Sequence, residues 1–95
     1  MNRIPVAHLR EQGQNMVIVP MDRSFAYKSL DEQNEIRATL QVAAKSADLA
    51  GTVVPVWDAG GGRMGFIAPS QWRSFFSGLS LRIVARNINR EIVWS

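Results

Sequence analysis

Short apolar runs separated by polar turns give the first outline of the chain. Residues 16–21 (MVIVPM) and 52–57 (TVVPVW) are continuous and rich in β-branched side chains, as is typical of buried strands. Residues 63–68 (RMGFIA) predict a further strand. Residues 4–9 (IPVAHL) fit either a strand, with the following EQGQ as a turn, or a short helix, and the pattern leaves both interpretations open.

A helix is predicted to begin after Ser29. Ser29 and Glu32 form the S-x-x-E pattern of a capping box, in which each side chain accepts a hydrogen bond from the other residue's backbone N–H. Gly51 is predicted to end the helix in a left-handed conformation. One apolar stripe at helical spacing is formed by Ile36, Leu40, Ala43, Ala47 and Ala50.

Two more helices are predicted in the last third of the chain. The first opens at Ser70 and sets Trp72, Phe75, Phe76 and Leu79 on one face. The second is predicted over residues 81–93. Its apolar face comprises Leu81, Val84, Ala85, Ile88 and Ile92.

These elements predict the α+β class, with a single domain over residues 1–95. Residues 15–95 form the α+β core, and residues 1–14 add an N-terminal strand or helix. The architecture expected is a two-layer sandwich, in which helices cover one face of a small mixed sheet of three or four strands. The expected order is β-α-β-β-α-α. Pro55 lacks an N–H for the sheet, so its strand is expected at an edge or at a bulge.

Residues 60–65 (GGGRMG) match the G-x-G-x-x-G pattern of dinucleotide-binding loops. That fingerprint needs a helix directly after its glycines, and Pro69 would interrupt such a helix within two turns. Residues 80–90 also lack the acidic side chain that would bind a ribose. The favoured interpretation is a hairpin loop whose glycines adopt positive φ, and no cofactor is expected. An anion-binding nest with Arg63 is the alternative.

The net charge of +3 is concentrated in the last third of the chain. Residues 62–95 hold five arginines and one glutamate, whereas residues 1–61 hold six basic and seven acidic side chains. Arginine suits phosphate and carboxylate partners. The predicted anion or nucleic-acid contact comprises Arg73 and a helical stripe of Arg82, Arg86 and Arg90. The alternative is a solvated face whose alkyl stems cover nearby apolar groups.

A second set of side chains points to a protein partner. Ile83, Val93 and Trp94 lie together on the wheel of the predicted last helix, outside its main apolar face. Such a strip predicts a homodimer or a contact with a partner subunit. The alternative is that the tail folds back on its own domain. Trp72, Phe75 and Phe76 could stack on nucleic-acid bases, but their helical spacing favours a place in the core.

Catalytic and metal chemistry find little support. His8 is the only histidine and cysteine is absent, so no metal site is expected. Asp22 follows a strand, but a single carboxylate does not make a mechanism, and no G-x-S-x-G elbow is present. No run approaches the roughly 20 apolar residues of a membrane span. A cytoplasmic protein without membrane association is expected.

Three functions follow in order of preference. The first is a non-catalytic protein–protein interaction module or subunit, self-associating through the predicted C-terminal helices. The second is a nucleic-acid-binding regulator that uses the arginine stripe. The third is a small-ligand binder or minor enzyme near Asp22 and the glycine loop.

Overall fold

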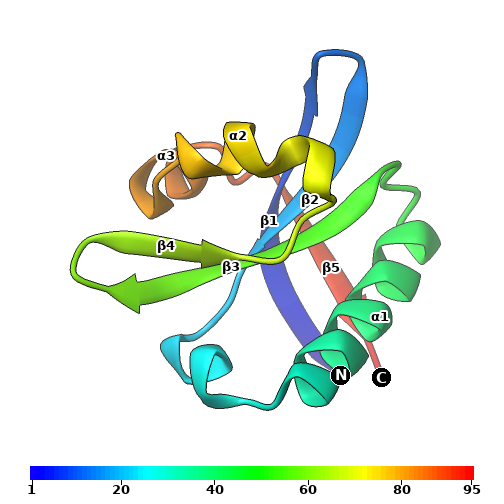
Figure 1. The fold of residues 1–95 in the computed structure, drawn as a ribbon. Coiled ribbons are helices and arrows are strands. Elements are labelled where there is room, and N and C mark those ends of the chain that lie inside the picture. Colours follow the sequence, from blue (N-terminus) through cyan, green and yellow to red (C-terminus); the bar gives the residue numbers. More distant parts are fainter.

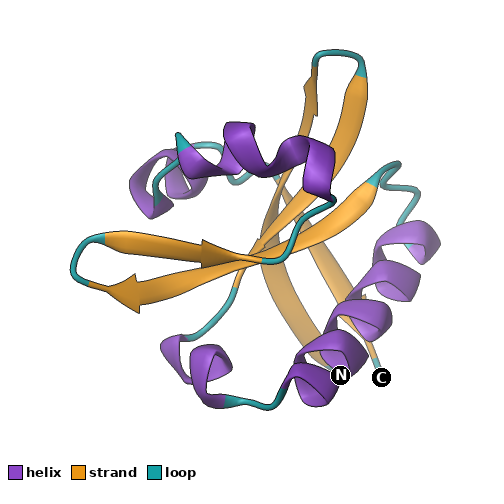
Figure 2. Ribbon diagram, in the orientation of Figure 1, coloured by secondary structure: helices purple, strands orange, loops and turns teal.

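A computed structural model describes residues 1–95 as a five-stranded sheet with helices on both sides (Figures 1 and 2). The strands lie in the order β4-β3-β2-β1-β5; β2 and β3 are parallel, and all other neighbours are antiparallel. The strands are β1 (Asn2–Glu11), β2 (Gln14–Pro20), β3 (Thr52–Gly60), β4 (Arg63–Phe66) and β5 (Arg90–Trp94). The helices are η1 (Arg23–Tyr27), α1 (Leu30–Ser46), η2 (Ser70–Trp72), α2 (Arg73–Ser77) and α3 (Leu81–Arg86). The predicted α+β class is confirmed. No helix has the length and apolar character needed to cross a membrane.

Strand β1 is shared between two ladders. Its residues 7–11 pair with β2, and its residues 2–6 pair with β5. Continuing the β1–β2 register by two residues would set Pro5 opposite Pro20, and neither proline has an N–H to donate. The first ladder therefore ends where the second begins. The N-terminal segment, for which strand and helix were both open, is a strand.

Helices cover both faces of the sheet, so the two-layer expectation is wrong. On one face α1 packs over a cluster that includes Val17, Val19 and Val53. On the other face α2 and α3 cover a cluster that includes Ile18 and Val54. Successive residues of a strand point to opposite faces of the sheet, and β2 and β3 carry apolar side chains on both faces. A continuous apolar strand must be covered on both sides, which a single helical layer does not provide.

The capping box of α1 is confirmed. The Glu32 N–H donates to the Ser29 hydroxyl at 3.1 Å, and the Ser29 N–H donates to the Glu32 carboxylate at 3.2 Å. The predicted helix end is wrong, because α1 stops at Ser46 and the left-handed residue is Asp48, at φ 60°. Ala44 is buried in the core, whereas the predicted stripe members Ala47 and Ala50 are exposed.

The last predicted helix is also wrong beyond Arg86. Helix α3 ends there, and residues 90–94 form β5 along the edge of β1. Isoleucine, valine and tryptophan at residues 92–94 favour an extended chain once a strand edge is available. The sheet gains two strands, β1 and β5, over the three that were firmly predicted.

Pro55 lies in β3, an internal strand, and not at an edge or at the bulge, which falls between Asp58 and Gly60. Its carbonyl accepts from the Ile67 N–H at 3.1 Å, so the backbone polar groups of Pro55 face the β4 side. Strand β4 ends at Phe66, opposite Val56, and the missing N–H therefore falls beyond the ladder. The internal strand tolerates this proline because only one bond is missing, the reciprocal one from residue 55 to the Ile67 carbonyl, at the end of the β3–β4 ladder.

We predict that Gly51→Ala destabilises the fold by more than about 2 kcal/mol. Gly51 adopts φ 116°, and an added Cβ would overlap the Asn15 backbone. Gly61→Ala is the matched control, because Gly61 also has a positive φ (61°) but nothing lies within 4 Å of its would-be Cβ. Urea unfolding of both variants measures the difference. Equal losses would contradict the role of the Asn15 contact.

Candidate interaction surface

The glycine loop is a hairpin turn, as predicted. Residues 60, 61 and 62 adopt φ of 87°, 61° and 76°, and the loop joins the antiparallel strands β3 and β4. Gly65 has a different role, since a Cβ there would overlap the indole ring of Trp57. That ring packs in turn against Phe25, with ring centroids 5.0 Å apart. The last glycine of the motif therefore serves aromatic packing, and the chain continues as a strand and not as a helix.

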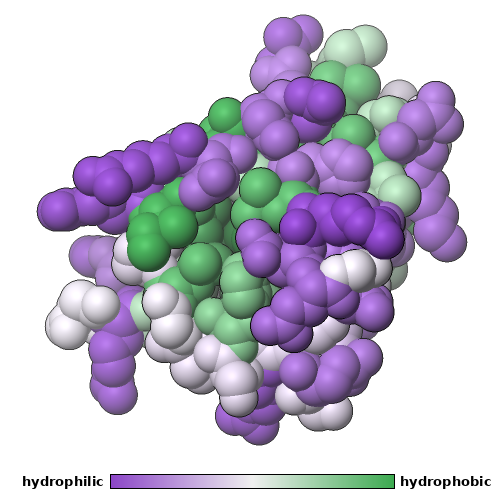
Figure 3. Space-filling view, turned by 90° about the horizontal axis from the view of Figure 1, so that it is seen from above, coloured by the Kyte–Doolittle hydropathy of each residue, from purple (hydrophilic) through white to green (hydrophobic).

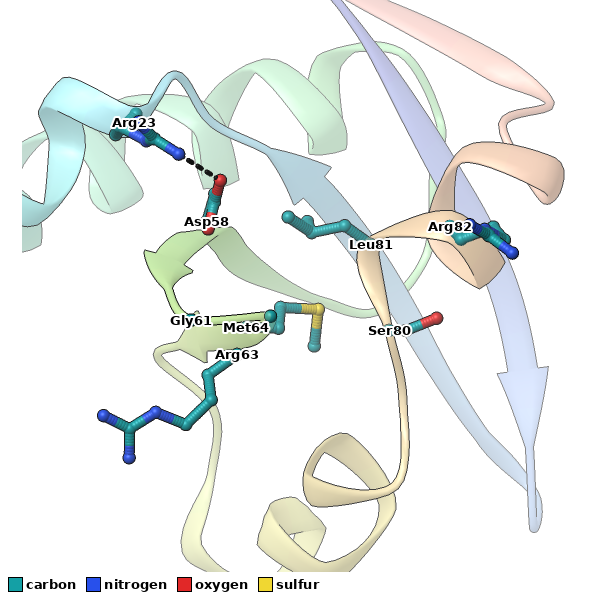
Figure 4. A pocket seen from close by; sticks show the side chains of 9 residues that line it. Arg23, Asp58, Gly61, Arg63, Met64, Ser80, Leu81 and Arg82 are labelled. Atoms are coloured by element: carbon teal, nitrogen blue, oxygen red, sulfur yellow. Dashed lines mark hydrogen bonds and ion pairs between the residues drawn. The ribbon is translucent and has the colours of Figure 1, made fainter.

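A groove of about 510 Å³ lies beside this loop (Figure 4). At one end the Arg23 guanidinium donates to the Asp58 carboxylate at 2.6 Å. Asp58 also accepts from the Gly60 N–H at 2.8 Å. The Arg23 hydrogen bond, followed by that from Gly60, holds the pKa of Asp58 below its ordinary value. Both carboxylate oxygens are thus engaged in holding η1 and the loop against β3.

The positive side chains of this groove do not converge on one point. Figure 4 shows Leu81 pointing across the groove towards Asp58, while Arg63 and Arg82 extend away from it in different directions. A phosphate cradle requires donors aimed at a common position. The observed geometry does not provide one.

The other polar residues considered for chemistry are engaged in local structure. The Asp22 carboxylate accepts from the Ser24 N–H at 3.1 Å at the start of η1, and hydrogen bonding by Ser24 lowers the pKa of Asp22. The His8 Nε2 lies 2.8 Å from the Ala50 carbonyl and is the donor of that bond, because a carbonyl only accepts. Neither residue lines the groove beside the glycine loop.

The four arginines predicted to contact an anion are all exposed. Arg73 begins α2, Arg82 and Arg86 lie one turn apart on α3, and none of the three forms an ion pair. Arg90 does not continue their stripe, because it begins β5 and donates to the Asn89 carbonyl at 2.8 Å. The helical stripe is therefore two arginines long.

The aromatic side chains at residues 72–76 belong to the core. Trp72 and Phe76 are buried, and Phe75 is half-buried. The Phe76 ring lies 5.2 Å from that of Phe75 and 5.6 Å from that of Phe66. Base stacking would need an exposed ring face. Of these side chains only Phe75 is exposed even in part.

The three predicted interface residues do not form one strip. Ile83 lies on α3 and is 40% exposed, whereas Val93 and Trp94 lie in β5. Trp94 packs against the core beneath α1, and Val93, which is 42% exposed, points to the opposite face of the strand. The helical wheel grouped them because it assumed a helix that the chain does not form.

A different apolar surface joins α1 to β5. Trp94 separates two shallow grooves, of about 270 and 420 Å³, between the helix and the strand. Val42 lines the larger groove and is 66% exposed. Beyond the grooves β5 is an outer strand of the sheet, with no neighbour on its far side. The sequence offered no signal for Val42, because it lies outside the apolar stripe of α1.

Another hollow lies on the face of the sheet that α2 and α3 cover. It encloses about 550 Å³ between the tip of the β1–β2 hairpin and α2, with Met16, Trp72 and Phe75 among its lining. Figure 3, which views this end of the molecule from above, shows apolar side chains at the surface surrounded by hydrophilic ones. Glutamine and glutamate side chains on the hairpin form part of the lining.

Comparison with protein-family models, with curated proteins and with solved structures found no match to this chain.

Acid destabilisation is expected from the engaged carboxylates. The pKa values of Asp58, Asp22 and Glu32 are held below their ordinary values, so in acid the unfolded chain binds protons more readily than the folded one. Their contribution to stability is complete above the unfolded pKa of about 4 and is lost as the pH falls through the lower folded values.

Urea midpoints measured from about pH 6 down to about pH 2.5 should therefore fall, and Asp58→Asn should flatten part of that dependence. Asp31→Asn is the control, since the Asp31 side chain makes no hydrogen bond or ion pair. If Asp58→Asn and Asp31→Asn gave the same pH profile as the wild type, the Arg23–Asp58 bond would have no energetic role.

Proposed function

We propose that this protein is a non-catalytic interaction module that self-associates through its C-terminal segment. The observation that carries the proposal is the open edge of β5 lying beside the apolar grooves of α1. An unpaired strand edge is a template for another strand. Exposed apolar side chains next to such an edge add hydrophobic contact to the backbone pairing.

The way polar groups are used supports a binding role over a catalytic one. Asp58, Asp22, Ser29 and His8 each hold a turn, a cap or a loop in place. A catalytic pair needs a base and a nucleophile within hydrogen-bond reach of each other. No side-chain to side-chain hydrogen bond forms in this chain apart from the Arg23–Asp58 pair.

Nucleic-acid binding is a second candidate function. The observation that favours it is the set of exposed arginines at residues 63, 73, 82 and 86, none of which has an acidic partner. They come from the loop side of β4, from α2 and from α3, and together they outweigh the single acidic residue of the last third of the chain. Phosphate contacts from such side chains would be independent of sequence and sensitive to salt.

Light scattering coupled to size exclusion tests self-association. We expect a mass of twice 10.6 kDa for the wild type, and a return to the monomer mass in Val42→Lys. Leu30→Lys is the matched control, because Leu30 lies on the same helix and is similarly exposed (68%) but lines neither groove beside Trp94. A monomeric wild type at all concentrations would exclude self-association, and equal effects of the two lysines would exclude this surface.

Fluorescence anisotropy with a mixed-sequence oligonucleotide tests the second function. If the arginines bind phosphate, affinity should fall steeply with salt, and Arg82→Gln/Arg86→Gln should reduce the slope of log K against log salt by about 2. Arg10→Gln/Lys45→Gln removes the same charge from exposed positions outside the arginine set and is the control. Binding that is absent, or that both double variants weaken equally, would exclude a specific arginine surface.

A further inference from the structure

We infer that self-association is a two-fold pairing of β5 with the β5 of a second copy, antiparallel and centred on Ile92. The two five-stranded sheets then join into one sheet of ten strands. This inference rests on the proposed function and specifies its partner, its surface and its register.

The direction of the β5 backbone groups follows from the contacts of Asn89. The Asn89 N–H donates to the Val6 carbonyl at 3.1 Å. Its side-chain amide donates to the His8 carbonyl at 3.0 Å and accepts from the His8 N–H at 2.8 Å. The even-numbered residues of β1 therefore turn their polar groups towards β5. Because hydrogen-bonded and non-hydrogen-bonded pairs alternate, Ile4 and Ile92 form a hydrogen-bonded pair.

The odd-numbered residues of β5 consequently turn their polar groups outward. Glu91 and Val93 each present an N–H and a carbonyl to the open edge. Pro5 stands opposite Glu91 and has no N–H to donate, which is consistent with a pair that exchanges no hydrogen bonds between β1 and β5. Two residues with outward donors and acceptors, placed on either side of Ile92, match a copy of themselves turned by 180°.

Charge and the number of paired residues select among the registers in which Glu91 and Val93 face the second copy. Centring on Ile92 pairs all five residues of β5, with Glu91 opposite the second copy's Val93 and Arg90 opposite its Trp94. An arginine against a tryptophan is a favourable cross-strand pair. A register centred on Glu91 would oppose two carboxylates and pair only three residues, and one centred on Val93 would also pair only three.

The two-fold axis also accounts for the apolar surface beside the strand. An axis perpendicular to the sheet leaves both α1 helices on the same face, with Val42 and the grooves at Trp94 next to the joined strands. Specific interfaces bury about 1,200–2,000 Å² in total, so pairing of two short strands needs this added contact. The opposite edge of the sheet is less suited, since β4 has four residues, one of them Gly65.

Disulfide mapping tests the register directly, because the chain has no cysteine of its own. Hydrogen-bonded antiparallel pairs have Cα atoms about 5.5 Å apart, within the range of about 4.4–6.8 Å that a disulfide spans. Diagonal neighbours are about 7–8 Å apart. A mixture of Glu91→Cys and Val93→Cys chains should therefore cross-link under mild oxidation, whereas either variant alone should cross-link at least tenfold more slowly.

A backbone variant keeps the test independent of cysteine chemistry. Val93→Pro removes an outward N–H without removing a β1–β5 hydrogen bond, so the dimer dissociation constant should rise at least tenfold while the circular dichroism spectrum is retained. Val93→Thr keeps the N–H and should remain dimeric.

The outcomes separate this inference from the proposed function. A dimeric wild type in which Val93→Cys cross-links efficiently by itself would overturn the register centred on Ile92. A dimer with no cross-linking in any combination would overturn strand pairing and leave self-association standing. A wild type that is monomeric, with no cross-linking, would overturn both.

Discussion

The structure depends on the division of β1 between two ladders. One half of the strand pairs with β2 and the other half with β5, and the change of partner falls between Val6 and Ala7. At this point the Asn89 side-chain amide bonds both polar groups of His8 and stands in for the missing strand backbone. Without this junction the C-terminal residues would have no edge to join, and Ile92 would leave the core beneath α1.

The apolar strands β2 and β3 determine how the helices are distributed. Since β2 and β3 lie inside the sheet with apolar side chains on both faces, each face requires a cover. Helix α1 takes one face and is held to β3 by Gln41, which donates to the Gly51 carbonyl and accepts from the Val53 N–H. The short helices α2 and α3 take the other face. With both faces covered, the outer strands β4 and β5 retain free backbone groups at the edges of the sheet.

The small size of the domain explains how its polar side chains are used. In a domain of this size, most side-chain oxygens are needed to close turns and cap short helices. Asp22, Ser29 and Asp58 are used in this way. The proposed interactions therefore rest on the open edge of β5, on the exposed apolar side chains beside it and on the exposed arginines.

Several features were determined by the sequence alone because their causes are local. The capping box needs only Ser29 and Glu32 at the right spacing, and the glycine loop needs only residues that tolerate positive φ. The β-branched runs at β2 and β3 favour an extended chain by their own side-chain shape. The prediction that residues 60–65 belong to a β-hairpin, and not to a phosphate loop, depended on Pro69 nearby in the chain. Each of these signals lies within a few residues of the structure it specifies.

The tertiary structure decided the rest, because the deciding partners are far away in the chain. Residues 90–94 satisfy a helical wheel as well as a strand pattern, and the choice was made by β1, more than 80 positions earlier. Gly51 is needed because a side chain there would overlap the Asn15 backbone, and no local rule for helix ends predicts that contact. The apolar groove on which the proposed interface rests forms only because Val42 and Trp94, on different elements, line it together. Local pattern specifies which conformations a segment favours, whereas the free energy of burial and strand pairing selects among them.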